Sequence, residues 1–299
     1  MEIYSRRQFL KLTGIAVAGS QINFLSALNP SQTMVEESYR GRALAAVPVY
    51  SRPGTNGTIV TTLWPDSVVS ITGVEQDWYQ VAEGYVARES MQPMTPYQPQ
   101  HRVQIRETSF WGEVVGAVAP IRQFCAADAP HITRIGHGGV AQIVDYLPGE
   151  PYGWYGIGDG NGSFTGWSQA IYWQPVDHTL NETGDHHIEI DLQGQYLTAR
   201  EDGEVILQAP CSIGESVRSG SYTVQEQIPS GQSLEVENVP DVIHGVPWIT
   251  TFGDRHRLSG AYWHNRFGKQ TPGPSIQVTP LLAHWLYSWL NENSRIVTI

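Results

Sequence analysis

The sequence has little of several features that whole classes of protein require. Its 299 residues include two cysteines, Cys125 and Cys211, too few for a disulfide-rich scaffold or a cysteine-based zinc site. It has 18 Lys and Arg against 29 Asp and Glu, a net charge of −11, and no basic stripe, so no nucleic-acid partner is expected. After Leu28, no apolar run is long enough to span a membrane.

What the chain does have points to short strands and turns. It contains 30 Gly and 19 Pro, with 10 Trp and 14 Tyr, and few long apolar runs at helical spacing. Hydrophobic residues make up 40% and charged residues 16%, a balance typical of globular proteins. We therefore expect a mainly β protein with two or three small domains.

The first forty residues predict an export signal followed by a linker. Ser5-Arg6-Arg7-Gln8-Phe9-Leu10-Lys11 has the twin-arginine pattern, and a mildly apolar run from Leu12 to Leu28 follows it. The predicted location is extracytoplasmic, at the cell wall or the outer membrane face. A basic amphipathic helix on a cytosolic protein is the alternative. Because no clean A-x-A follows Leu28, an uncleaved membrane anchor also remains open.

Two later stretches look like copies of one unit, over residues 41–97 and 110–178. Each has a short extended start, turn residues, alternating strands and then a Trp-Tyr strand, Trp78-Tyr79 and Trp154-Tyr155. This order resembles the bacterial SH3-like domains of cell-wall proteins, so two small β-barrels are expected.

The Trp-Tyr strands make a prediction about burial. Side chains alternate across a strand, so one residue of each pair should be buried in a barrel and the other should face outward. If the units are duplicates, Trp78 should occupy the same strand position as Trp154. Both tryptophans are candidate binding residues for a wall ligand.

The third unit, residues 185–299, contains the most informative motifs. His187-Ile188-Glu189-Ile190-Asp191-Leu192 alternates as a strand does. Farther on come Leu258-Ser-Gly-Ala-Tyr-Trp-His-Asn-Arg-Phe-Gly268 and Pro272-Gly-Pro-Ser-Ile-Gln-Val-Thr-Pro280, and then Ala283-His-Trp-Leu-Tyr-Ser-Trp289. These stretches resemble the active-site segment of bacterial L,D-transpeptidases (the YkuD-type domain), which cross-link peptidoglycan through a cysteine nucleophile.

The resemblance implies a degenerate site. The family's cysteine falls on Ser275, its neighbouring histidine on Gly273, and its base histidine on Ser259. A thiol is readily deprotonated by an adjacent imidazole, whereas a serine hydroxyl needs an aligned base. Pro274 lacks the N–H that an oxyanion site in this turn would use, and it should bias Gly273 toward extended geometry.

Other residues near the motif carry weaker expectations. Tyr262, Trp263 and His264 are candidate binding residues. His264 matches a family histidine that is not the base, and His244 and His256 are the other imidazoles that a rewired serine site could use. Odd spacing should turn His256 to the strand face opposite Ser259.

The remaining motifs predict structure rather than chemistry. Thr279-Pro280 should start a helix that runs to about Asn291. Its buried face should carry Ala283, Leu286, Tyr287 and Leu290. Asp185-His186-His187 is expected to be a linker rather than a metal site, and Gly156–Gly162 a hairpin tip.

Cys211 is expected to be a small buried residue, and pairing with Cys125 is open. No metal or cofactor is expected.

Two functional hypotheses compete. In the first, the chain is an exported, catalytically inactive wall protein that binds peptidoglycan, its stem peptides or other cell-wall enzymes, with membrane contact only through an uncleaved N-terminal segment. In the second, it is an L,D-transpeptidase-type acyltransferase with Ser275 as an unconventional nucleophile. The replaced residues favour the first.

Overall fold

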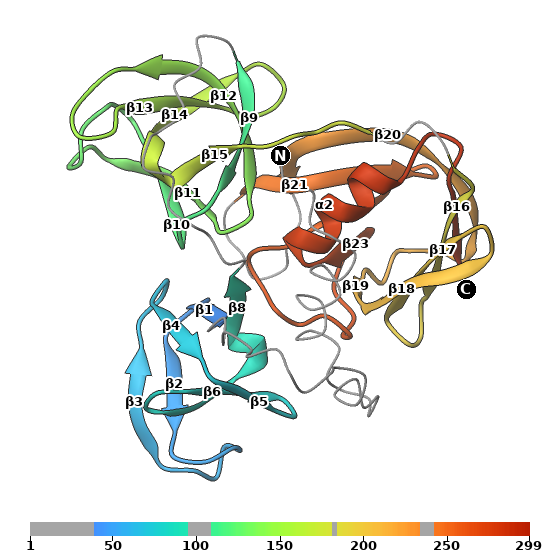
Figure 1. The fold of residues 1–299 in the computed structure, drawn as a ribbon, viewed down its shortest axis with the longest axis horizontal. Coiled ribbons are helices and arrows are strands. Elements are labelled where there is room, and N and C mark those ends of the chain that lie inside the picture. Colours follow the sequence, from blue (N-terminus) through green and yellow to red (C-terminus); the bar gives the residue numbers. More distant parts are fainter. Residues whose placement is uncertain (1–38, 95–108, 181–183, 234–241) are drawn as a thin grey trace, which may run out of the picture. The chain divides into compact units, whose positions relative to one another are not determined.

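The computed structural model describes residues 39–94, 109–180, 184–233 and 242–299 (Figure 1). The twin-arginine stretch lies outside these residues. The chain divides into two compact units, Met1–Pro96 and Tyr97–Ile299. Within the described residues no helix is long and apolar enough to cross a bilayer. The fold is mainly β, as expected.

The first unit is a small barrel made from two sheets. A three-stranded sheet has the order β4-β1-β8, and a five-stranded sheet has the order β3-β2-β7-β6-β5. A short 3₁₀ helix, η2 (Arg88–Ser90), links the last two strands. The strands are β1 (Tyr39–Ala43), β2 (Val47–Tyr50), β3 (Ile59–Leu63), β4 (Val68–Ile71), β5 (Gly73–Glu75), β6 (Trp78–Val81), β7 (Gly84–Ala87) and β8 (Met91–Met94).

The second unit begins with another barrel. Its seven strands form one sheet, in the order β11-β10-β14-β13-β12-β9-β15, and the 3₁₀ helix η3 (Ala170–Tyr172) precedes the last strand. The strands are β9 (Phe110–Val114), β10 (Val118–Arg122), β11 (His131–Gly136), β12 (Val140–Leu147), β13 (Trp154–Gly158), β14 (Phe164–Gln169) and β15 (Trp173–Pro175).

The two barrels share one order of elements. Trp78 and Trp154 are the first residues of β6 and β13, and each pairs with the residue that precedes the 3₁₀ helix. Tyr79 and Tyr155 are buried while both tryptophans remain partly exposed, as strand alternation predicts. This correspondence is what an internal duplication requires.

The sequence did not reveal the first strand of either barrel. Gly41 in β1 and Gly112 in β9 weaken the strand signal. A Cβ at Gly41 would lie 2.9 Å from Ile71 Cδ1, and one at Gly112 would lie 3.1 Å from Ile143 Cγ1. At both positions a core side chain packs directly against the backbone of the strand, where a larger residue would collide with it.

The rest of the second unit is a nine-stranded mixed sheet, in the order β18-β17-β16-β24-β20-β21-β22-β23-β19. Two pairs are parallel, β16 with β24 and β22 with β23. Strand β20 pairs with β24 through its first residues and with β21 through the rest. The strands are β16 (His186–Asp191), β17 (Tyr196–Glu201), β18 (Glu204–Pro210), β19 (Ser212–Ile213), β20 (Gly220–Ser233), β21 (Ile243–Phe252), β22 (His256–Gly260), β23 (Ser275–Val278) and β24 (Arg295–Thr298).

One helix, α2 (Pro280–Trp289), packs against β21 and β22 (Figure 1). The Thr279 side chain accepts a hydrogen bond from Leu282 N (3.3 Å) and Pro280 occupies the first turn, so the predicted start is confirmed. The four residues predicted for its inner face are buried. The predicted end at Asn291 was two residues late, because Leu290 already has extended backbone.

Two smaller expectations had different outcomes. The predicted hairpin tip, Gly156–Gly162, was only partly right, because Gly156–Gly158 still belong to β13. The turn that follows is held by Asp159 Oδ1, which accepts hydrogen bonds from the backbone N–H of Asn161 (2.8 Å) and Ser163 (3.0 Å). The linker assigned to His186 was wrong. His186 starts β16, is buried, and stacks on Trp289 with ring centroids 4.3 Å apart.

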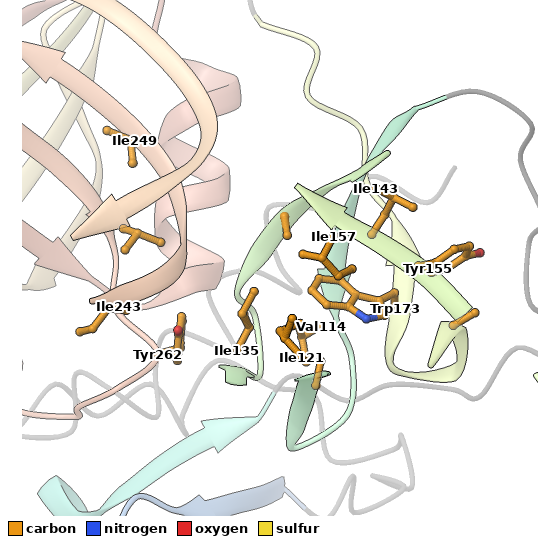
Figure 2. Packing of buried hydrophobic residues seen from close by; sticks show 14 residues of the cluster. Val114, Ile121, Ile135, Ile143, Tyr155, Ile157, Trp173, Ile243, Ile249 and Tyr262 are labelled. Carbon is orange, nitrogen blue, oxygen red and sulfur yellow. The ribbon is translucent and has the colours of Figure 1, made fainter. Parts of the chain in front are cut away.

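The second barrel and the nine-stranded sheet share one hydrophobic cluster (Figure 2). Ile135 from β11 lies in it together with Ile243 and Tyr262 of the sheet region. Gly245 has φ 65°, and a Cβ there would come within 2.8 Å of Ile135 Cδ1. The hydroxyl of Ser230 also donates a short hydrogen bond to the carbonyl of Val140. These contacts join the barrel to the sheet.

Shared packing leads to a stability prediction. Ile135→Ala should lower the free energy of unfolding of the second unit by about 2–5 kcal/mol, because it opens a cavity between barrel and sheet. The residue at the equivalent place in the first barrel, Leu63, is only partly buried, so Leu63→Ala should cost less. Denaturant titration followed by hydrogen exchange would measure both losses, and equal losses would contradict the prediction.

Candidate functional site

The two motif stretches meet in the sheet. Strand β22 runs parallel to β23, with Ser259 opposite Gln277 and Arg257 opposite Ser275. On its other side β23 pairs with β19, which sets Ser212 opposite Gln277. Residues opposite one another in a sheet share a face, and so do alternate residues along a strand. The structure therefore brings Ser259 and Ser275, both predicted from the sequence, onto one polar face.

His264 lies over this face with both ring nitrogens occupied. Its Nε2 is 2.6 Å from Gln277 Oε1, and its Nδ1 accepts a hydrogen bond from Arg266 N at 3.2 Å. An amide oxygen can only accept, so these partners fix a neutral ring that carries its proton on Nε2. Burial lowers the pKa of His264 to about 4; the bond to Gln277 opposes this shift and the charge of Arg266 adds to it.

This pairing decides what His264 can do. A general base needs a free ring nitrogen directed at the proton that it removes. The lone pair on Nδ1 of His264 accepts a hydrogen bond from the backbone N–H of Arg266, and its Nε2–H donates to Gln277 Oε1. In this arrangement His264 orders the loop and does not serve Ser275 as a base.

The turn before Ser275 is held by backbone hydrogen bonds. Gly214 N donates to Ser275 O (2.8 Å), Ser216 N donates to Gly273 O (3.1 Å), and Thr271 N donates to Ile213 O at the end of β19 (3.1 Å). A Cβ at Gly214 would lie 1.9 Å from Gly273 O, so only glycine permits this approach.

The predicted conformation of Gly273 was wrong. We expected Pro274 to hold it in the extended region, but its φ is 86°. Glycine has no Cβ, so it reaches this region without strain, and the proline restriction that applies to other residues does not decide its φ. A histidine at this position, as in the family motif, would be strained in the same turn.

The two other candidate histidines, His244 and His256, pack elsewhere in the described part of the chain. His256 begins β22 and packs against Tyr222 and Phe252, three residues before Ser259, so strand alternation turns it to the other face. His244 lies in β21 beside the second barrel, where its carbonyl accepts a hydrogen bond from the Tyr262 hydroxyl (2.6 Å).

The two cysteines are free thiols, and no disulfide joins them. Cys211 is fully buried as expected, and its backbone anchors the motif loop by accepting a hydrogen bond from Gly268 N (2.9 Å). Burial raises the pKa of the Cys211 thiol, and the charge of Asp191 adds to the effect. A buried thiol with a raised pKa is a packing residue rather than a nucleophile.

The aromatic binding candidates lie in three places. Tyr262 is buried in the cluster that joins the sheet to the second barrel. Trp263 packs edge-on against it with centroids 5.3 Å apart. Trp78 packs edge-on against Tyr50 in the first barrel (5.4 Å), and Trp154 stays partly exposed at the start of β13.

Sequence reasoning missed the charge of this region. Residues 254–280 contain four basic residues and a single acid, Asp254, in a chain whose net charge is −11. All four basic side chains are exposed: Arg255, Arg257, Arg266 and Lys269. Counting charge along a sliding window would have revealed residues 254–280 as a positively charged region of an acidic protein.

Comparison with known proteins gives only distant similarities. No family model matches the chain, and no curated protein matches it. Among solved structures, the catalytic domain of an Enterococcus faecium L,D-transpeptidase shares 15% identity over 40% of this chain and 100% of that one, with a TM-score of 0.34. L,D-transpeptidases from Mycobacterium smegmatis (16% identity, TM-score 0.35) and Mycobacterium tuberculosis (14%, 0.35) each match 60% of this chain, and 77% and 76% of their own lengths. Similarity at this level establishes no activity for this chain.

Burial of neutral His264 predicts a pH effect on stability. The unfolded chain binds a proton near pH 6.5 and the folded chain only near pH 4, so stability is complete above about pH 6.5 and is lost as the pH falls toward 4. The loss should reach about 3 kcal/mol at pH 4.

Comparison of urea unfolding at pH 7 and pH 4 isolates this contribution. His264→Gln should remove most of the pH-dependent loss, whereas His131→Gln, which changes an exposed histidine, should leave it unchanged. Equal pH dependence of wild type and His264→Gln would contradict the assignment.

Proposed function

We propose that this chain is an exported peptidoglycan-binding protein with an L,D-transpeptidase-like sheet that no longer transfers acyl groups. The observation that carries this proposal is the hydrogen bonding of His264. It is the imidazole that lies over the polar face of Ser259, Ser275 and Gln277, and both its nitrogens are engaged.

The chemistry of acyl transfer explains why this matters. A nucleophile must lose a proton as it attacks a carbonyl, and the leaving amine must gain one. Around Ser275 the face offers hydroxyl groups, one amide and the guanidinium of Arg257, none of which exchanges protons readily at neutral pH. Loss of a general base alone removes about 10²–10⁴-fold in rate.

The charge of the motif loop supports a binding role. Stem peptides of peptidoglycan carry free carboxylates, and the exposed Arg255, Arg257, Arg266 and Lys269 surround the two motif strands with positive charge. Cationic side chains concentrate an anionic polymer near a site even where each contact is weak. Other wall enzymes are a second class of partner for the same surface.

The inactive site predicts a specific result with acylating reagents. Purified protein incubated with a carbapenem or with a tetrapeptide donor should show no covalent adduct by intact-mass spectrometry. An adduct that maps to Ser275 and disappears in Ser275→Ala would establish the alternative, an acyltransferase with an unconventional serine nucleophile.

Wall binding should depend on the basic loop. Replacement of Arg257 and Arg266 by Ala should lower co-sedimentation with purified peptidoglycan several-fold, and binding of the wild type should weaken as salt is raised. Replacement of Arg295 by Ala, an exposed arginine on β24 outside the motif, is the matched control and should have little effect. Equal losses in the two proteins would contradict a role for this loop.

Export is the remaining part of the proposal. It rests on Arg6-Arg7 ahead of Phe9-Leu10-Lys11 and the apolar run. Replacing both arginines by lysine should retain the protein in the cytoplasm, as judged by fractionation and immunoblotting. Unchanged export of that variant would rule out the twin-arginine route.

A further inference from the structure

The first barrel has an edge strand without the usual protection. Strand β3 ends the five-stranded sheet, and its sequence, Ile-Val-Thr-Thr-Leu, carries no charge, proline or glycine. Ile59 is 55% exposed, Val60 50%, and Trp64, the residue after the strand, 75%. Natural edge strands are normally guarded by charges or proline, because unpaired edges recruit other strands.

The corresponding edge strand of the second barrel, β11, carries a charged residue. This strand is also at the edge of a sheet, and it corresponds to β3 because the pairing register shifts at the same place, between Val49 and Tyr50 in one barrel and between Ile121 and Arg122 in the other. In this correspondence Thr62 matches Arg134.

The same correspondence locates Trp64. It matches Gly136, next to Ile135, which packs against the nine-stranded sheet. The end of β11 is therefore buried within the second unit, whereas the corresponding end of β3 leads into an exposed tryptophan.

We propose that β3 is a self-association edge, which pairs antiparallel with β3 of a second copy of this chain about a two-fold axis near Thr62. Pairing about this axis sets Thr62 opposite Thr62, Thr61 opposite Leu63, and Trp64 opposite Val60. Each contact joins hydroxyl or apolar groups, and pairs of this kind stabilise antiparallel strands. Two of the three exposed apolar side chains, Trp64 and Val60, cover one another.

A second copy fits this edge better than a foreign strand because the edge is complementary to itself. It has no charge that a partner of opposite sign would have to match. Strand β11 cannot pair in the same way, since Arg134 would face Arg134 across the axis. An isologous pair also closes on itself and leaves no free β3 edge, so it stops at the dimer.

The geometry limits the strength of the dimer. Val60 is the extra residue of a β-bulge, so regular pairing is confined to a few residues around Thr62. The buried area is small and the two copies repel one another through a net charge of −11 each. The dimer should therefore form in the micromolar range and tighten with added salt.

Sedimentation velocity of the full chain, from about 5 to about 500 μM, tests this inference. The wild type should shift from monomer to dimer, more readily at high salt. Val60→Lys should shift this transition at least tenfold upward in concentration, and Trp64→Ala should weaken it. Ile132→Lys is the matched control, since Ile132 is the bulged residue of β11 and is 49% exposed.

Each outcome decides the matter. A wild type that stays monomeric at the highest concentration overturns the inference. A dimer that Val60→Lys leaves intact, or that Ile132→Lys weakens as much, overturns it too, because the interface would then lie elsewhere. Circular dichroism of both lysine variants establishes that the barrels remain folded.

Discussion

The parallel pairing of β22 with β23 is the constraint on which the site depends. It brings together two stretches that are separated by the motif loop and fixes Ser259 opposite Gln277. The loop between them must then return along β19, which it does through hydrogen bonds to Cys211 O and Ile213 O. Because β23 leads directly into α2, the same pairing also positions the helix against the sheet. A shift in this register would move every residue of the polar face.

The two barrels have matching strands but differ in the side chains at equivalent places. Arg42 Nε donates to Gln92 Oε1 (2.9 Å) in the first barrel, and at the equivalent place in the second, Gln174 Nε2 donates to Glu113 Oε2 (3.1 Å). The glutamine is kept while the charge beside it is reversed. In the first barrel Arg42 also forms an ion pair with Asp66 (2.9 Å). In the second barrel burial raises the pKa of Glu113, and the hydrogen bond from Gln174 opposes this shift.

The residue that matches Asp66 explains why the second barrel can pack on the sheet. Counting back from the equivalent Val68 and Val140, it is Gly138, and both residues have positive φ, 64° and 76°. A Cβ at Gly138 would lie 2.7 Å from Pro280 Cβ. Only a barrel with glycine in this turn can approach the start of α2 so closely.

Much of the fold was readable from the sequence because local chemistry determined it. Thr279-Pro280 specified the start of the helix, and the Trp-Tyr pairs specified which side chain enters each barrel. The site was only half readable. Alignment of the motif identified Ser259 and Ser275, but the partner of His264 is Gln277, 13 residues away, and only the strand register brings them together. The φ of Gly273 was missed because it is set by the hydrogen bond of its carbonyl to Ser216.

The hydrogen bonds around His264 also limit what this ring can do chemically. A catalytic imidazole must gain and lose a proton near neutral pH, which requires solvent access or a charged partner. Here burial lowers the pKa of His264 to about 4, so the ring is neutral at neutral pH. The neutral ring bonds the Gln277 amide oxygen and the backbone N–H of Arg266, and so it holds the loop that carries Arg266. These hydrogen bonds therefore give the ring a structural role, in which it ties β23 to the loop that follows β22.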